Sequence, residues 1–93
     1  MRFDWDETKN ASNRRKHGVS FEEASAVFYD PLHLTRFGGV VGGEDRWSTI
    51  GLVGNRYLLI VAHTLEDEDG ELVRIISARE ATPHERRDYE DDL

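Results

Sequence analysis

The sequence predicts an α+β fold, in which helices pack against an antiparallel sheet. Three observations support this class. Helix start and stop signals cluster before residue 31, three apolar and β-branched runs follow one another between residues 46 and 79, and a further helix-capping signal comes after the last run. The length of 93 residues suits a single modest core, so residues 1–93 are predicted to form one domain.

The first part of the chain is predicted to form a short strand and two helices. Residues 1–5 alternate between apolar and polar side chains, as a half-buried strand does. Asp6 can cap a helix over residues 7–16, whose basic last turn is followed by a glycine. Ser20 and Glu23 have the spacing of a capping box, which predicts the start of a second helix.

The second part is predicted to form a three-stranded meander and a final helix. The strand-like runs cover residues 46–53, 56–64 and 72–79, and they are apolar on both faces, which favours a central place in the sheet. Before them, the glycine-rich residues 38–43 indicate a loop or a hairpin tip. Whether an additional strand lies beside this segment is not decided by the sequence. The predicted sheet is therefore the meander plus the N-terminal strand, with two N-terminal helices. A third helix begins at the capping box of Thr82 and Glu85.

The charge of the chain is unevenly distributed. The formal net charge is −7, from 19 acidic residues against 12 lysines and arginines. Residues 66–71 hold five of the acids and residues 88–92 hold four, with no base in either block. The remaining chain has a small excess of bases, so an anion-binding face is compatible with the acidic total. The chain has no cysteine, which excludes disulfides and thiolate sites, and no apolar run long enough for a signal peptide or a membrane span. We expect a cytoplasmic protein.

The predicted hairpin brings a histidine and an arginine together. If Gly54 and Asn55 form a two-residue turn, counting back along both strands places Arg46 opposite His63, with Cβ atoms about 5 Å apart. A slip of one residue would send one partner to the other face. On the last strand, Ser77 and Arg79 share a face and simple alternation turns Arg74 to the other.

These residues have the chemistry that metal-free RNA cleavage requires. The ribose 2′-hydroxyl must lose a proton, the 5′-oxygen must gain one, and the phosphorane between them carries additional negative charge. Histidine transfers protons near neutral pH, and arginine holds charged oxygens with a planar set of donors. DNA is a less suitable substrate because it has no 2′-hydroxyl to act as the internal nucleophile.

Each candidate also has a structural explanation. Arg14, Arg15, Lys16 and His17 end a predicted helix, where positive charge is favourable by about 0.3–1 kcal/mol per residue. His63 follows a long apolar run and can be a hydrogen-bonded strand residue. Trp47 can pack on the sheet or stack on a base. The four histidines have no metal-ligand spacing, so neither a metal nor another cofactor is predicted.

Several segments together resemble the BrnT family of bacterial toxins. They are "FDWDETKNASNRRKHGVSFEEASAVFYDP", "RWSTIG", "AHT" and "RIISAREATPHER", in this order, and the resemblance extends from Phe3 to about Tyr89. It implies a RelE-like fold and a ribonuclease that arrests growth by cutting RNA. It also implies a partner antitoxin, a BrnA-like ribbon-helix-helix protein, through which the complex would contact DNA indirectly.

Carried over by position, the resemblance implies a set of site residues. His63 is the first candidate for general acid or base, with His17 or Lys16 as the second proton-transfer or phosphate-binding group. Arg46, Arg79 and Arg74 would stabilise the transition state. The residues expected to bind RNA are Arg14, Arg15, Trp47 and Ser77.

Two alternatives remain open at this stage. The chain could be a binding module without turnover, acting with its antitoxin as a co-repressor. It could also be a toxin that poisons a protein target, as related ParE-type proteins do, and such a toxin would need no histidine.

Overall fold

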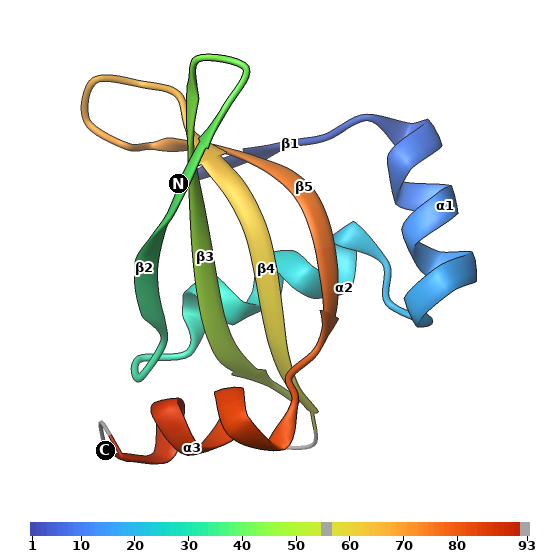
Figure 1. The fold of residues 1–93 in the computed structure, drawn as a ribbon. Coiled ribbons are helices and arrows are strands. Elements are labelled where there is room, and N and C mark those ends of the chain that lie inside the picture. Colours follow the sequence, from blue (N-terminus) through green and yellow to red (C-terminus); the bar gives the residue numbers. More distant parts are fainter. Residues whose placement is uncertain (55–56, 92–93) are drawn as a thin grey trace.

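The computed structural model describes residues 1–54 and 57–91, in which five strands form one mixed sheet of order β1-β5-β4-β3-β2 (Figure 1). The elements of this described part, in chain order, are β1 (Arg2–Asp4), α1 (Glu7–His17), α2 (Phe21–Ser25), the 3-10 helix η1 (Ala26–Tyr29), β2 (Leu34–Val41), β3 (Glu44–Val53), β4 (Tyr57–Leu65), β5 (Leu72–Glu80) and α3 (Pro83–Asp91). No helix among the described residues is long and apolar enough to span a membrane.

The predicted helix caps are confirmed. The Asp6 side chain accepts hydrogen bonds from the backbone N–H groups of Thr8 and Lys9, at 2.7 and 3.3 Å. At the other end of α1, Gly18 adopts φ 72° and donates its N–H to the Arg14 carbonyl. Both hydrogen bonds of the capping box at Ser20 are present, although α2 narrows after Ser25 into the 3-10 turn η1.

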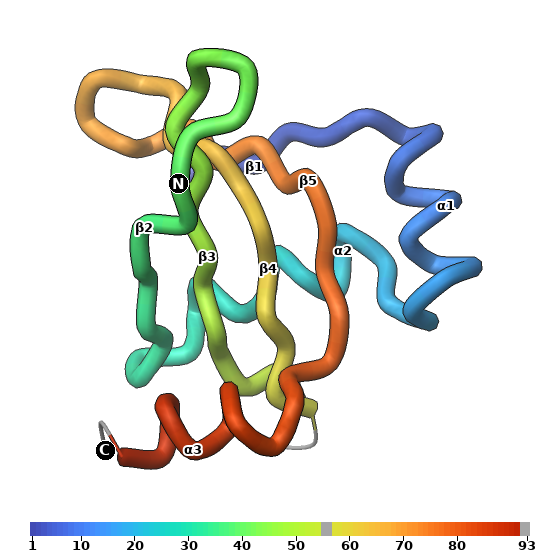
Figure 2. The backbone as a smooth tube through the Cα atoms, viewed as in Figure 1, coloured from blue at the N-terminus to red at the C-terminus, as the bar shows by residue number. Residues whose placement is uncertain are grey.

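The sheet differs from the prediction in two respects. Residues 34–41 form a full edge strand, β2, which pairs with β3 and extends with it beyond the rest of the sheet as a hairpin (Figure 2). The N-terminal strand β1 lies beside β5 and is parallel to it, so the sheet is mixed and not purely antiparallel. Acidic side chains from the β4–β5 loop hold β1 in this position, because Asp67 forms an ion pair with Arg2 and Glu71 lies 3.1 Å from the terminal amine of Met1.

The predicted register of the β3–β4 hairpin is wrong by one residue. Val53 pairs with Tyr57, and Trp47 therefore pairs with His63 in place of Arg46. The predicted turn residue Asn55 lies outside the described residues, but the pairing requires a connection one residue longer than the two-residue turn. Arg46 consequently points to the opposite face of the sheet from His63.

One face of the sheet is covered by α2 and η1 and forms the main core (Figure 1). Gly51 of β3 permits the close approach of η1, since a Cβ at that position would lie 2.7 Å from the Val27 carbonyl oxygen and 2.9 Å from the Val27 Cβ. The buried residues of this core are Val19, Phe21, Ala24, Val27, Phe28, Leu59, Val61, Val73, Ile75 and Ala78.

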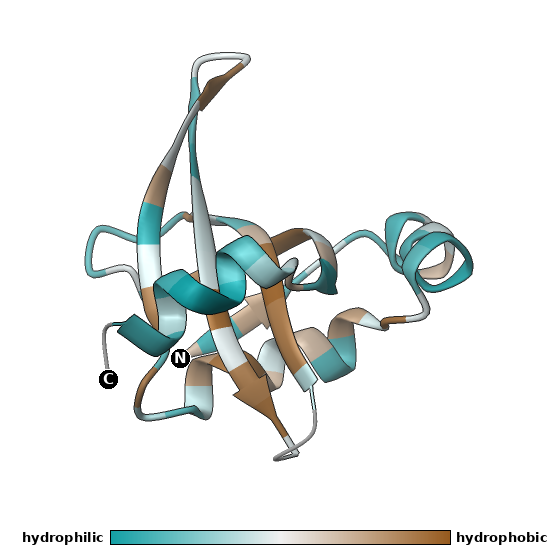
Figure 3. Cartoon of the chain, turned by 60° about the horizontal axis from the view of Figure 1, so that its bottom comes forward, coloured by the Kyte–Doolittle hydropathy of each residue, from teal (hydrophilic) through white to brown (hydrophobic). Residues whose placement is uncertain are grey.

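The other face is covered only at one end, by α3. Most of this helix is hydrophilic (Figure 3), and its apolar anchor is Tyr89, which packs with Ile50 and Leu58 in a second, smaller core. The Tyr89 hydroxyl also donates to Asp30 at 2.6 Å, and burial together with this carboxylate raises the pKa of Tyr89 to about 12. The predicted capping box of Thr82 and Glu85 is confirmed at the start of α3.

Candidate functional site

The face of the sheet opposite the main core, which α3 covers only at one end, is termed the open face. Cross-strand partners share a face, so the registers of β2 to β5 define which side chains it carries. The pairings Arg36–Ser48, Ser48–Ala62 and Ala62–Ser77 form one row across it. Arg46 lies on the same face two residues before Ser48. The polar and small residues of the open face are Arg36, Arg46, Ser48, Ala62, Thr64, Arg74, Ser77 and Arg79.

A β-bulge brings Arg74 onto the open face together with Ser77 and Arg79. His63 pairs with Ile75 while its neighbour Ala62 pairs with Ser77, which leaves Ile76 as the additional residue of β5. The simple alternation that separated Arg74 from Ser77 and Arg79 is therefore wrong. Nothing in the segment "RIISAR" marks the bulge, since it contains no glycine or proline.

Arg79 is held by a carboxylate of α3. Its Nη1 and Nη2 atoms lie 2.7 and 2.9 Å from the two carboxylate oxygens of Glu85, in a bidentate pair. The hydrogen bonds from Arg79 are the main cause that lowers the pKa of Glu85 to about 2, and they raise the pKa of Arg79. The contact fixes the guanidinium on the open face, which Arg79 shares with Ser77 of the same strand.

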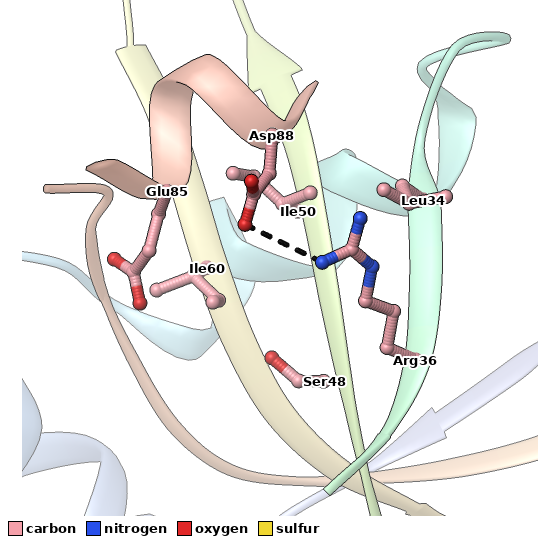
Figure 4. A pocket seen from close by; sticks show the side chains of 7 residues that line it. All are labelled: Leu34, Arg36, Ser48, Ile50, Ile60, Glu85 and Asp88. Carbon is pink, nitrogen blue, oxygen red and sulfur yellow. Dashed lines mark hydrogen bonds and ion pairs between the residues drawn. The ribbon is translucent and has the colours of Figure 1, made fainter. Parts of the chain in front are cut away.

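Arg36 is held by the next carboxylate of the same helix. Its Nη1 lies 3.4 Å from the Asp88 Oδ2, and the two side chains point toward each other across a cavity of about 90 Å³ (Figure 4). The cavity lies between α3 and the sheet, and its lining residues are Leu34, Arg36, Ser48, Ile50, Ile60, Glu85 and Asp88.

Arg46 and Arg74 share one carboxylate at the other end of the open face. Glu44 places Oε2 at 2.7 Å from the Arg74 Nη2 and Oε1 at 3.5 Å from the Arg46 Nε. Arg74 also lies 3.3 Å from the Glu66 carboxylate. Each described arginine of the open face therefore faces a carboxylate, and the basic charge of this surface is compensated within the chain.

The C-terminal end of α1 adjoins the open face at β5. Lys16 and His17 line a hollow of about 220 Å³ together with Ile76 and Ser77. Both basic side chains are exposed, and they lie at the helix terminus where a positive charge is favourable. The structure thus places Lys16 and His17 beside Ser77, so these three predicted site residues lie together.

Asn13 determines this position of α1. Its side-chain amide donates to the carbonyls of Val19 and Ala78, at 2.9 and 2.8 Å, and its oxygen accepts from the Ala78 N–H at 3.1 Å. Asn13 is buried, and it ties α1 to β5 one turn before the basic end of the helix. Sequence reasoning missed it, although an asparagine inside a predicted helix is unfavourable and is a signal for a specific contact.

His63 lies in the main core, where it has no exposed surface. Its Nδ1 donates to the Thr64 carbonyl at 3.1 Å, because a carbonyl can only accept, and its Nε2 accepts from the Thr49 hydroxyl at 2.7 Å. The ring also packs edge-on against Phe28, at a centroid distance of 5.0 Å. Burial lowers the pKa of His63, and this geometry supports the structural explanation of the residue over a role in proton transfer to RNA.

The remaining candidates lie away from the open face. Trp47 shares the face of His63 and packs edge-on against Phe37, at 5.3 Å between ring centroids. Arg14 and Arg15 line a separate hollow on α1 together with Ala11. These three residues can therefore contact a partner or RNA only outside the open face.

Comparison with known proteins identifies the family. A family model described as "Ribonuclease toxin, BrnT, of type II toxin-antitoxin system" matches residues 5–85. The crystal structure of the Brucella abortus ribonuclease toxin BrnT, at 1.1 Å resolution, is similar with a TM-score of 0.66 and 25% sequence identity, over 88% of this chain and 97% of that chain. A comparison with curated proteins gives no match.

The α+β architecture, with its mixed sheet and three helices, is thus that of a ribonuclease toxin. The chain belongs to the BrnT family of type II toxin–antitoxin systems, and this membership implies a protein antitoxin as its partner.

Proposed function

We propose that the chain is a single-domain, RelE-like endoribonuclease that cuts RNA at the open face without a metal ion. The observation that carries this proposal is the gathering of arginines and hydroxyls on one accessible sheet surface, beside an exposed lysine and histidine. A substrate RNA would meet this surface in the cytoplasm, where the resulting cleavage would arrest growth.

The proposed reaction uses the 2′-hydroxyl of the RNA as nucleophile. His17, with Lys16 beside it, is the accessible group for proton transfer, and it replaces His63 in this role because His63 is buried. Arg79, Arg74 and Arg46 would hold the phosphate oxygens as negative charge develops on them. The expected product ends are a 2′,3′-cyclic phosphate and a 5′-hydroxyl.

Cleavage of a defined RNA by the antitoxin-free protein in EDTA tests this proposal. We expect EDTA-resistant cleavage that His17→Gln reduces by about 10²-fold or more, with unchanged cleavage in the matched variant His84→Gln on α3. Products with 3′-hydroxyl ends would exclude attack by the 2′-oxygen. Full activity of His17→Gln would remove His17 from the proton transfer.

The partner that we propose is a BrnA-like ribbon-helix-helix antitoxin, and DNA would be bound only through that protein. Lys16 and its neighbours Arg14 and Arg15 are exposed, so an acidic antitoxin segment could pair with them. Replacing all three with Gln should weaken the complex and reduce its sensitivity to salt. A complex that is insensitive to salt and unchanged by these substitutions would contradict the proposed contact.

A second candidate function is a non-catalytic binding module that acts with the antitoxin as a co-repressor. The compensating carboxylates on the open face favour it, because a surface without net positive charge attracts RNA weakly. The purified protein would then neither cleave RNA nor arrest growth, whereas arrest without cleavage of free RNA would indicate a ribosome-dependent toxin or a ParE-like poison of a protein.

A further inference from the structure

We infer that Arg46 and Arg74 form a phosphate-binding position on the open face, which the Glu44 carboxylate occupies in the free protein as an internal competitor of RNA. This inference rests on the proposed function and adds a regulatory element to the same site. It assigns a role to Glu44, the first residue of β3, which pairs with Val41 at the end of the β2–β3 hairpin.

The geometry of Glu44 is that of an anion held by two cations. One carboxylate oxygen lies 2.7 Å from the Arg74 guanidinium and the other lies 3.5 Å from the Arg46 Nε. The two arginines come from different strands and converge on this one group. A phosphodiester presents two charged oxygens with similar spacing, so it can make the same contacts in place of the carboxylate.

Two polar atoms of this cluster lack a hydrogen bond within the described part of the chain. They are the Arg46 Nε and the Thr64 hydroxyl, both buried. Thr64 pairs with Arg74, and the β3–β4 register carried one residue beyond Trp47 and His63 brings Arg46 level with Thr64. The carboxylate therefore leaves donors unused, which a phosphate with its additional acceptor oxygens could engage.

Displacement of Glu44 requires little rearrangement. Its side chain is 36% exposed, and among the described residues these two arginines are its only ion-pair partners. Arg74 retains Glu66 when Glu44 leaves, at 3.3 Å. Ion pairs between partly exposed side chains are weak and salt-sensitive, so an RNA chain can compete with this one.

The neighbouring acid provides a matched control. Asp45 follows Glu44 on β3 and pairs with Val40, so it points to the opposite face of the hairpin. Glu44→Gln and Asp45→Asn each remove one negative charge at adjacent positions. Only Glu44→Gln removes the carboxylate from Arg46 and Arg74, and a general effect of net charge would act on both variants alike.

The test is the affinity of antitoxin-free protein for a short 2′-O-methyl RNA, which cannot be cleaved through its 2′-oxygen. We expect Glu44→Gln to lower Kd by about three- to tenfold and Asp45→Asn to lower it by about twofold or less. Equal changes in the two variants, or no change in Glu44→Gln, would overturn the inference and leave the proposed function intact.

Titration with inorganic phosphate separates the inference from the proposed function. In Glu44→Gln, the NMR signals of the Arg46 and Arg74 side-chain Nε–H groups should shift with added phosphate, and in Asp45→Asn they should shift less. If no form of the protein binds RNA, the proposed function fails. The phosphate titration then decides the inference alone, and unshifted arginine signals in Glu44→Gln would overturn it.

Discussion

On the side of the sheet that α2 covers, His63 and Thr49 are fully buried and form a hydrogen bond with each other within the core. The open face instead carries arginines that form ion pairs with carboxylates at its margins. The two faces come from the same strands and differ only in the alternation of side chains. A polar residue on the first face contributes to packing and to a unique fold, and the exposed polar residues on the second, such as Ser77, are available to a ligand. Substitutions on the first face should therefore change stability, and substitutions on the second should change activity.

The largest expected effect is a loss of stability from a substitution on the face of the sheet that forms the main core. Ile75→Ala should lower the free energy of unfolding by about 2–5 kcal/mol, since Ile75 is fully buried. The adjacent bulge residue provides the control, because Ile76→Ala removes the same atoms from a partly exposed position and should cost about 1 kcal/mol or less. Urea unfolding of both variants measures the difference, and equal losses would contradict the assignment of faces.

On the open face, Arg79→Gln should reduce RNA cleavage by about 10²-fold. The loss of stability should be about 1 kcal/mol or less, because the Arg79 side chain is 42% exposed. Arg87→Gln, an exposed substitution on α3, should leave both quantities unchanged. A variant Arg79→Gln that is strongly destabilised but fully active would show that Arg79 serves only to attach α3.

Substitution of Asn13 should change both the stability and the activity of the protein. Asn13→Ala should cost about 1–3 kcal/mol, because it leaves the Ala78 N–H and two carbonyls without their partner. It should also reduce activity, since the same contact positions Lys16 and His17 beside Ser77. Thermal unfolding and cleavage assays below the melting temperature separate the two effects. Full activity of the folded variant would contradict the positioning role.

The smallest predicted effect is a pH dependence of stability caused by His63. Its pKa in the folded protein is below the ordinary value of 6.5, so the unfolded chain takes up the proton first. The stabilisation is complete above about pH 6.5 and declines as the pH falls toward the folded pKa, by less than about 1.4 kcal/mol per pH unit. Urea midpoints between pH 7.5 and 5.5 measure this slope. His63→Gln should remove the contribution and His84→Gln should retain it, while identical slopes in all three proteins would exclude His63 as the source.

The local structure could be predicted because its causes are local. Asp6, the Ser20 capping box and the Thr82 capping box begin helices where the sequence predicts them, since each cap depends on residues at most three positions away. The strands β3, β4 and β5 were predicted for a similar reason, because their apolar and β-branched composition is continuous.

The arrangement of the site could be predicted only in part, because it depends on register. One additional residue in the β3–β4 connection moved Arg46 away from His63, and the bulge at Ile76 moved Arg74 to the side of Arg79. Neither change has a marker in the sequence. The carboxylates that hold the arginines come from the hairpin, the β4–β5 loop and α3, so the compensated charge of the open face follows from tertiary contacts alone.

The central claim is that RNA binds the open face. The NMR signals of two alanine methyl groups, one on each face of the sheet, test this claim most directly. Ala62 pairs with Ser77 on the open face, and Ala78 pairs with Val61 in the main core. In antitoxin-free protein with labelled alanine methyl groups, a 2′-O-methyl RNA should shift the NMR signal of Ala62 and leave that of Ala78 close to its original position. An unshifted Ala62 signal in protein that has bound the RNA would place the RNA elsewhere and would contradict the account.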